Sequence, residues 1–523
     1  MSEEQKPLRF LFFMLHAGFI RFYRRPIELL AERGHEVHLA FTRIEKDPGD
    51  RRLAEELAAS NPRITFGEAP LRRRNDGWRP LAALVRSFVD LGRYVDPRYA
   101  DSPALRRRMA QKFADHAGTA RRIDPFSSWL TRRVIHFMDA RSSERLSRRI
   151  VRSLDTVERA IPTSERVDAY LRERRPDAVL VTPVIEFAST QVEYLKSARK
   201  AGIPSGVAVA SWDNLTGKGL IRIVPDRVFV WNTLQVDEAV EMHGIPRERV
   251  AVTGAPKFDE WFERAPRTDR AAFAAKVGLD PGGPFVVYAC SSPFITPDEV
   301  SFVRRWLDAL RADERLAGLG LLVRPHPQNA AQWDGVDLSE HGNVAIWPPH
   351  GAQPDAGDAR ADFFDSLAYS AAVVGINTSA LIEAAIVGRS VLAPAADEFA
   401  GTQAGTLHFR YLLFENGGFV HVGVTLDEHR DQLAAVLERG DEHAEQTRRF
   451  IESFVRPLGL DRPAAPILAD AFEALGRSAA QPSHRSVGDR ALRILLTPAA
   501  AAVSVVGGIA GRLRKAPPAA EIA

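Results

Sequence analysis

The stretch VVGINTSALIEAAIVGRSVLAP, residues 373–394, has the pattern of a strand, a short polar turn, a helix and a second strand. The turn Asn377-Thr378-Ser379 falls where the first strand ends and the helix begins. A helical crossover of this kind joins parallel strands. The segment therefore predicts a parallel α/β sheet with small polar side chains at its carboxyl edge, where such sheets bind ligands.

The same alternation of strands and helices occurs twice along the chain. A length of 523 residues is too great for one hydrophobic core. The expected strands form two series, at 10–15, 36–42, 177–183, 206–210, 226–232 and 249–256, and at 284–292, 319–327, 343–349, 371–379 and 390–395. We therefore expect an α/β protein with two doubly wound, Rossmann-like domains that face a cleft.

The expected domain boundaries follow from these series. Residues 1–265 form the first domain, 266–442 the second, and 443–478 a pair of late helices. Residues 479–523 form a tail.

The segment 72–175 differs from the rest of the first domain, because it is Arg-rich and has apolar residues at helical spacing. Residues 72–152 hold 20 Lys and Arg against 8 Asp and Glu. We interpret this segment as a helical insertion with a local basic surface. The concentration of the positive charge in one segment argues against nucleic acid as the partner of the whole protein. An anionic membrane surface or a lipid-linked acceptor is the expected partner, and a solvated helical face is the alternative.

Two further features concern location. The chain has one cysteine, Cys290, and its first residues are acidic with a short apolar run, so we expect a cytoplasmic protein. The tail RILLTPAAAAVSVVGGIAGRLRK, residues 493–515, is apolar between basic residues. A peripheral membrane contact at the inner face of the cell membrane is expected there, with a disordered tail as the alternative.

The polar turn at 377–379 suits a phosphate. A helix amino terminus offers unpaired N–H groups, to which Thr378 and Ser379 add hydroxyls. An ordinary helix cap explains the same residues. Glu383 favours the ligand interpretation, because a carboxylate in an Ala- and Ile-rich helix is costly to bury without a partner. A ribose diol is such a partner.

Two other loops follow strands of the second series. RPHPQN presents Arg324 and His326, and an arginine can grip phosphate oxygens with two parallel donors. ACSSP presents Ser291 and Ser292, which suit a diphosphate or merely complete a turn. A surface loop with a structural arginine is the alternative for the first.

The first domain offers two candidate bases. Asp213 lies in SWDNLTGKG after an apolar strand, and an Asx-turn is its structural explanation. His16 follows the first strand of the chain, where a loop histidine is often structural.

Several motifs are absent from the sequence. It contains no Asp-x-Asp, no P-loop, no GxGxxG after a strand and no His/Cys cluster with zinc spacing. We therefore expect a metal-independent enzyme without a cofactor.

Taken together, FLFFMLHAGFIRFYRRPIELLAERGHEVHLAF, RVFVWN, RVAVTGAPKFD, RPHP and the 373–394 block resemble GT-B glycosyltransferases. More narrowly they resemble bacterial surface-polysaccharide enzymes near the CDP-glycerol glycerophosphotransferase and UDP-N-acetylglucosamine 2-epimerase families. The resemblance implies a nucleotide-activated donor in the second domain, the acceptor in the first, and late helices, here 443–478, that cross back between them.

By this resemblance, Arg324 and His326 would meet the diphosphate, Thr378 and Ser379 the phosphate end, and Glu383 the ribose. Many retaining GT-B enzymes carry two Glu eight positions apart near this helix. Gly375 and Val391 stand at those spacings from Glu383, so that subclass is disfavoured.

The expected function is transfer of a sugar from a nucleotide-activated donor to a surface glycan or glycolipid. Transfer of a polyol phosphate and 2-epimerisation of a nucleotide sugar are the alternatives, and a non-enzymatic nucleotide-sugar-binding protein is a further one. Glu186, Asp213 and His16 are the acids and the histidine that the first domain offers to an epimerase.

Overall fold

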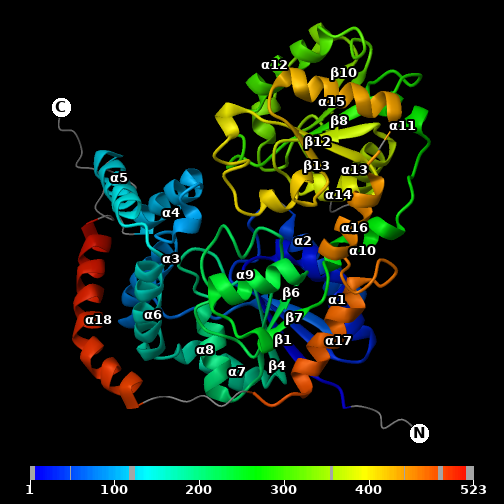
Figure 1. Ribbon diagram of the computed structural model, residues 1–523. Coiled ribbons are helices and arrows are strands. Elements are labelled where there is room, and N and C mark those ends of the chain that lie inside the picture. The colour runs from blue at the N-terminus through cyan, green and yellow to red at the C-terminus, as the bar shows by residue number, and fades with distance from the viewer. Residues whose placement is uncertain are drawn as a thin grey trace, which may run out of the picture. The chain divides into compact units, whose positions relative to one another are not determined.

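A computed structural model describes residues 6–47, 49–116, 124–353, 357–440, 442–480 and 487–513. The chain divides into two compact units. The first unit comprises Met1–Asp101, Leu105–Thr253 and Ala465–Ala523, and the second comprises Ser102–Ala104 and Gly254–Ala464. Each unit is built around its own parallel sheet with helices on its faces (Figure 1), which confirms the predicted α/β class.

The described strands of the first unit form a seven-stranded parallel sheet in the order β3-β2-β1-β4-β5-β6-β7. These strands are β1 (Arg9–Met14), β2 (Glu36–Phe41), β3 (Ile64–Glu68), β4 (Ala178–Thr182), β5 (Ser205–Ala208), β6 (Arg227–Val230) and β7 (Val250–Val252). Side chains alternate between the two faces of β1. Phe10 and Phe12 join one apolar cluster, whereas Leu11 and Phe13 join another, so both faces of the sheet are buried.

The helices of the first unit come from three parts of the chain. They are α1 (Ile20–Glu32), α2 (Asp50–Ser60), α3 (Trp78–Arg93), α4 (Pro103–His116), α5 (Asp124–Ala140), α6 (Glu144–Ala160), α7 (Glu165–Arg174), α8 (Val192–Ala201), α9 (Thr233–His243), α17 (Ala464–Arg477) and α18 (Val487–Leu513). Helix α17 packs on the first sheet, because the ring of Phe472 lies 5.9 Å from that of Phe12 and 5.0 Å from that of Phe229.

The second unit has a six-stranded parallel sheet among its described residues, in the order β10-β9-β8-β11-β12-β13. Its strands are β8 (Phe285–Ala289), β9 (Gly320–Arg324), β10 (Val344–Ile346), β11 (Ala372–Val374), β12 (Ser390–Pro394) and β13 (Val420–Gly423). Its helices are α10 (Asp259–Glu263), α11 (Arg270–Val277), α12 (Val300–Arg311), α13 (Gly357–Tyr369), α14 (Ala380–Ile386), α15 (Leu426–Arg439) and α16 (Ala444–Phe454).

The boundary between the units lies at 253/254 rather than at 265. Asp259 explains the difference, because it accepts hydrogen bonds from the Arg456 guanidinium at 3.0 Å and from the Ala464 N–H at 2.9 Å. Trp261 packs on Phe363 and Phe364. Helix α10 therefore belongs to the second unit. The late helices are also divided, since α16 lies in the second unit and α17, from Ala465 on, in the first.

The Arg-rich segment between β3 and β4 is helical, but part of its charge faces inward. Arg72, Arg86, Arg93 and Arg106 are buried. The Arg86 guanidinium, for example, lies 2.8 Å from Glu158 and 2.5 Å from Glu193. Arg107 of α4 and the arginines of α5 and α6 are exposed, and Arg108 of α4 is half-buried. The expected anionic partner of this segment stays a prediction.

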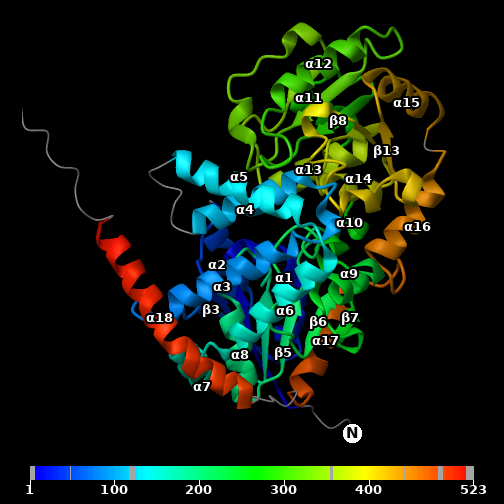
Figure 2. The same ribbon diagram turned by 60° about the vertical axis from the view of Figure 1, so that its left-hand side comes forward.

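The tail, for which disorder was the alternative expectation, contains helix α18 (Val487–Leu513). Helix α18 lies beside α3 and α6 in both views (Figures 1 and 2). Ala500 is buried there, and Arg493 donates a hydrogen bond to the Ala160 carbonyl at 2.8 Å. Ile494 and Leu495 are 72% and 74% exposed. Within the described residues, no helix has the length and apolarity needed to cross a membrane.

Candidate functional site

The loops after β8, β9 and β11 lie together at the carboxyl edge of the second sheet. The Cys290 N–H donates to the Arg324 carbonyl at 3.0 Å, and the Asn377 N–H donates to Ser291 Oγ at 3.3 Å. Gly375 allows this approach, because a Cβ at that position would lie 2.9 Å from the Ala289 carbonyl oxygen. The structure thus brings together the three loops that the sequence indicated separately.

Two of the expected donor-binding residues are used within the protein. Asn377 Nδ2 donates to the Thr402 carbonyl at 3.0 Å and to Thr406 Oγ1 at 3.2 Å. Ser291 is fully buried, and its N–H donates to both carboxylate oxygens of Glu299 at 3.1 Å. These contacts show how the loops are held.

Glu299 is a positioning residue that sequence reasoning missed. Burial raises the pKa of Glu299 to about 8, although the Ser291 N–H acts in the opposite direction. Tyr288 Oη also donates to this carboxylate, at 3.2 Å. Nothing in the spacing of Glu299, which follows a proline-containing turn, distinguishes it from an ordinary surface glutamate.

The hydroxyl side chains at this edge are half-buried. Thr378 Oγ1 accepts a hydrogen bond from the Ala380 N–H at 3.5 Å, and the Ser379 side chain makes no capping bond to α14. Ser292 begins a turn, in which its carbonyl accepts hydrogen bonds from the N–H groups of Ile295 and Thr296. All three residues lie at the expected carboxyl edge.

Arg324 ends β9 and is buried with few partners. Among the described residues, its guanidinium makes one hydrogen bond, to the Asp362 carbonyl at 3.3 Å. Its guanidinium carbon also lies 5.2 Å from the centre of the Phe363 ring. Burial lowers the pKa of Arg324 to about 10, with Asp362 opposing the shift. Because a guanidinium has five N–H donors, this arrangement leaves capacity to bind an anion.

His326 follows in the same loop and is half-buried. Its Nδ1 accepts a hydrogen bond from the Gln328 N–H at 3.1 Å. A neutral imidazole that accepts at Nδ1 carries its proton at Nε2. His326 is therefore held as the tautomer whose Nε2 is a donor.

Glu383 is a further desolvated carboxylate at this edge, and unlike Glu299 it has no hydrogen-bond donor among the described residues. Its side chain is 13% exposed, and none of the hydrogen bonds found among the described residues involves its carboxylate. Lys257 Nζ lies 3.8 Å from Glu383 Oε1, too far for a good hydrogen bond. Burial raises the pKa of Glu383 to about 7, and Lys257 only partly offsets this. A desolvated carboxylate without hydrogen bonds has the chemistry to accept ligand hydroxyls.

Lys257 was not expected from the sequence, where it stands in GAPKFD as an ordinary lysine. Its ammonium lies 4.3 Å from the centre of the Phe258 ring as well as near Glu383. The sequence signal was an acidic residue in the apolar helix α14, which indicates a buried carboxylate that needs a partner. This signal does not identify the partner, which lies 126 residues away in the sequence.

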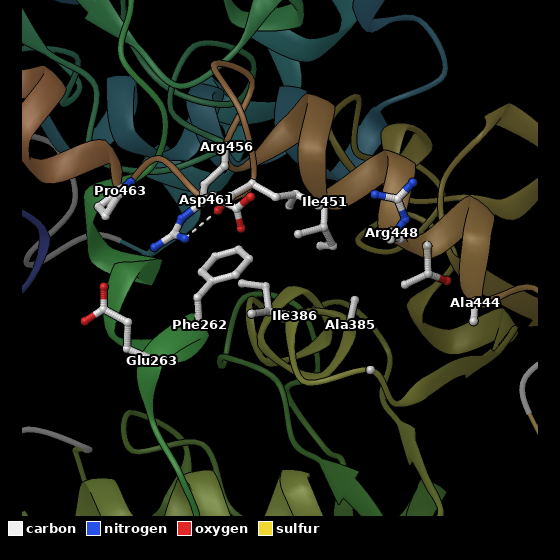
Figure 3. Close-up of a pocket in the computed structure, with 13 residues that line it drawn as sticks. Phe262, Glu263, Ala385, Ile386, Ala444, Arg448, Ile451, Arg456, Asp461 and Pro463 are labelled. Atoms are coloured by element: carbon white, nitrogen blue, oxygen red, sulfur yellow. Dashed lines mark hydrogen bonds between the residues drawn. The ribbon is translucent and has the colours of Figure 1, made fainter.

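A separate pocket of about 510 Å³ lies at the other end of α14 (Figure 3). Ile386 and Phe262 line it, and the Arg456 guanidinium lies 3.8 Å from the centre of the Phe262 ring. Arg456 is also bonded to Asp259 and to the Leu460 carbonyl at 2.6 Å. The Arg456 guanidinium in this pocket therefore already has hydrogen-bond acceptors within the protein, in contrast to Arg324 and Glu383.

In the first unit, the loop 211–222 carries Asp213 and is clamped by α3. The Arg93 guanidinium donates to the Lys218 carbonyl at 3.1 Å and to the Gly219 carbonyl at 3.0 Å. Asp90 accepts hydrogen bonds from the Leu220 N–H at 2.9 Å and from the Arg222 guanidinium. The inward-facing charges of the Arg-rich segment thus position the loop.

Asp213 is half-buried, and its Oδ1 accepts a hydrogen bond from Asn214 Nδ2 at 3.1 Å. Glu186, which follows β4, interacts electrostatically with Asp213. Lys218 Nζ lies 3.6 Å and Lys112 Nζ 3.9 Å from the Glu186 carboxylate. Asp213 and Glu186 therefore belong to one charged cluster at the carboxyl edge of the first sheet.

His16 lies apart from these contacts, beside Asp50. Its Nδ1 is 3.3 Å from Asp50 Oδ2, and Arg21 lies 2.9 Å from the other carboxylate oxygen. Burial lowers the pKa of His16 to about 4 despite the attraction of Asp50. The imidazole is neutral at neutral pH, and Asp50 was not anticipated from the sequence.

No family model matches the sequence, and no curated protein sequence matches it. Solved structures are similar at low identity. A putative UDP-N-acetylglucosamine 2-epimerase from Listeria monocytogenes is 11% identical with a TM-score of 0.49, over 90% of this chain and 98% of that one. The UDP-GlcNAc 2-epimerase from Methanocaldococcus jannaschii is 11% identical with a TM-score of 0.47, over 89% and 100%.

A variant of the wall teichoic acid polymerase TagF is 10% identical with a TM-score of 0.44, over 91% of each chain. These similar structures therefore include both kinds of enzyme that the sequence resembles. At these identities and TM-scores, they assign no reaction to the chain.

Proposed function

We propose that the protein is a GT-B type transferase that moves a sugar from a nucleotide-activated donor to a surface glycan or glycolipid. The observation that carries this proposal is Glu383, a buried carboxylate for which the described residues supply one distant ammonium and no hydrogen bond. A ribose diol would donate two hydrogen bonds to it. Burial of such a group is costly in the absence of a ligand, and a binding role accounts for it.

Arg324 supports the same assignment from the neighbouring loop. Its buried guanidinium has donors to spare, and it ends a strand of the same sheet edge. An arginine in this state favours phosphate oxygens, which it grips with two parallel N–H donors. His326, as an Nε2–H donor, would add to the grip on the diphosphate.

The donor should be identified by thermal-shift screening against UDP, GDP, CDP, CMP and dTDP compounds. Release of the nucleotide only when an acceptor is added would support a transferase. Interconversion of a free nucleotide sugar would instead indicate an epimerase. Transfer of a polyol phosphate from its nucleotide would indicate a polyol-phosphate transferase. Binding without any turnover would favour a non-enzymatic role.

Arg324→Met should weaken nucleotide binding at least about tenfold, because a charge-assisted hydrogen bond contributes about 1.5 to 3 kcal/mol. Methionine has a side chain of similar length but without the guanidinium that lies over the Phe363 ring. Isothermal titration with the best nucleotide of the screen measures the effect. Arg304→Met is the matched control, since Arg304 pairs with Glu340 on the surface of the same unit. Equal affinities in the two variants would refute the assignment of Arg324.

Asp213→Asn should leave nucleotide affinity unchanged and lower turnover about 100-fold or more, as expected for loss of a general base. The amide keeps the hydrogen-bonding contact to Asn214 that the carboxylate makes. Steady-state rates with a glycan acceptor, together with titration of the nucleotide, separate the two effects. Wild-type turnover in this variant would exclude Asp213 as the base.

A further inference from the structure

Two lysines from different elements converge on one carboxylate in the first unit. Lys112 comes from α4, and Lys218 from the loop after β5. Their ammonium groups lie 3.9 Å and 3.6 Å from the two oxygens of Glu186. The three side chains are each about two thirds buried, with exposed fractions of 33% for Lys112, 26% for Lys218 and 33% for Glu186. The cluster is therefore partly withdrawn from water yet open to a ligand.

The contacts within this cluster are incomplete. Both nitrogen–oxygen distances exceed the usual hydrogen-bond length. No hydrogen bond from either ammonium, or to the Glu186 carboxylate, occurs among the described residues. An ammonium has three donors, so the two lysines hold more donors than one carboxylate can accept.

The charges of the cluster are also unbalanced. Arg108 of α4 lies near enough to influence both Lys112 and Glu186. Asp90 also acts on Lys112, but its carboxylate is paired with Arg222. The remaining groups are three positive charges, on Lys112, Lys218 and Arg108, and two negative charges, on Glu186 and Asp213. Burial is the largest cause that lowers the pKa of Lys112; Glu186 opposes it, Arg108 and Lys218 add to it, and Asp90 opposes it more weakly. A further anion would relieve this excess of positive charge.

The backbone around the cluster is held in place before any ligand binds. Tyr94 Oη and Arg93 donate to the Lys218 carbonyl, at 2.9 Å and 3.1 Å. On α4, Arg106 donates to Asp139 at 2.9 Å and to Ser142 at 3.2 Å. Because these bonds already order the chain, binding an anion there costs little conformational entropy.

We propose that Lys112 and Lys218 bind an anionic oxyacid group of the acceptor, a phosphate or a carboxylate, with Glu186 accepting a neighbouring hydroxyl. The assignment of this oxyacid group to the acceptor rests on the proposed function, whereas the anion site itself does not. The two ammonium groups grip the oxyacid oxygens by charge-assisted hydrogen bonds. Glu186 holds the two ammonium groups near its two carboxylate oxygens and accepts a hydrogen bond from a hydroxyl of the ligand. The acceptor class is therefore an acidic glycan or a phosphate-linked one, rather than a neutral glycan.

Ligand-observed NMR titrations on the full chain test the site with three probes: glycerol 3-phosphate, glucuronate and neutral glycerol. All proteins carry Arg324→Met, so that anions bound in the second unit do not contribute. Lys112→Gln and Lys218→Gln should each weaken glycerol 3-phosphate binding about fivefold, allowing for partial exposure of the pairs. Arg107→Gln, an exposed neighbour on α4, is the matched control and should bind as the parent does.

Glu186→Gln gives the sharper result, because a purely structural carboxylate would not produce it. The side-chain oxygen of glutamine can still accept the ligand hydroxyl, while the negative charge beside the anion is removed. Glycerol 3-phosphate binding should therefore tighten about two- to fivefold at low salt, and the gain should shrink with added salt. Tighter binding of glucuronate than of glycerol 3-phosphate would identify a carboxylate acceptor, and the reverse a phosphate one. Equal binding of glycerol, no anion binding by the parent protein, or weaker binding in Glu186→Gln would overturn the proposal. Nucleotide binding with Arg324 intact is measured separately, so failure of the donor site is distinguishable from failure of this one.

Discussion

Asp90→Ala should destabilise the first unit by about 3 to 5 kcal/mol, the range for leaving a buried charge without its partner. Asp90 is fully buried on α3 and accepts hydrogen bonds from the Ala188 N–H at 2.7 Å and the Leu220 N–H at 2.9 Å. It also pairs with Arg222, whose side chain is fully buried. Alanine would leave that guanidinium and both N–H groups without their acceptor.

Urea denaturation followed by tryptophan fluorescence measures this loss. Asp237→Ala is the matched control, because its pair with Arg247 is 57% and 67% exposed and should contribute under about 1 kcal/mol. Removing both charges in Asp90→Asn/Arg222→Met should recover part of the stability, since no buried charge then lacks its partner. A loss in Asp90→Ala no larger than that in Asp237→Ala would contradict the clamp on loop 211–222.

Glu383→Gln should weaken nucleotide-sugar binding about tenfold above pH 8, because a carboxylate accepts hydrogen bonds more strongly than an amide does. The pKa of Glu383 is raised to about 7, so the wild-type carboxylate is neutralised as the pH falls below that value. Wild-type affinity should therefore fall between pH 8 and pH 5.5 toward the affinity of the variant. The affinity of the variant should stay flat over this range.

The same substitution has the opposite effect on stability. The pKa of Glu383 in the folded protein, about 7, lies above the 4.5 of the unfolded chain. The stability that the protein has with a protonated Glu383 is thus fully present below pH 4.5 and is lost as the pH rises through 7. The ionised group costs up to about 3 kcal/mol, at 1.36 kcal/mol for each pKa unit, so Glu383→Gln should raise the Tm at pH 8.

Calorimetric melting and isothermal titration from pH 5.5 to 8.5 measure both effects. A nucleotide sugar is a suitable probe, because its pyrophosphate diester does not titrate in this range. Glu415→Gln, an exposed glutamate of the same unit, is the control. Unchanged binding together with a raised Tm would mean that Glu383 is buried without a ligand role, and the donor site would then be assigned wrongly.

The sequence determined the parallel class and most strands of the two sheets, because the information for them is local, although β3 and β13 were not among the expected strands. Short apolar runs such as FLFFM are typical of strands buried on both faces, and the helical segments between them impose parallel crossovers. The same local pattern placed RPHPQN, ACSSP and INTSA at the carboxyl ends of strands, where β9, β8 and β11 now end.

Only the tertiary structure decided which polar residues of those loops remain for a ligand. Ser291 and Asn377 are used by Glu299 and Thr402, whereas Arg324 and Glu383 retain unused capacity. A buried polar group must find its partner somewhere in the fold, and that partner can be any residue of the chain. Sequence spacing cannot identify a partner as distant as Lys257 is from Glu383.

The Arg-rich segment shows the same limit in the opposite sense. Its composition indicated a surface for an anionic partner, but Arg86 and Arg93 face inward, toward Glu158 and the carbonyls of loop 211–222. Composition counts charges without their direction, and the direction depends on which carboxylates and carbonyls the fold brings beside each arginine. The sequence by itself therefore determined the framework and the location of its polar loops. The tertiary structure decided how each charge is used, because burial and pairing are set by long-range contacts.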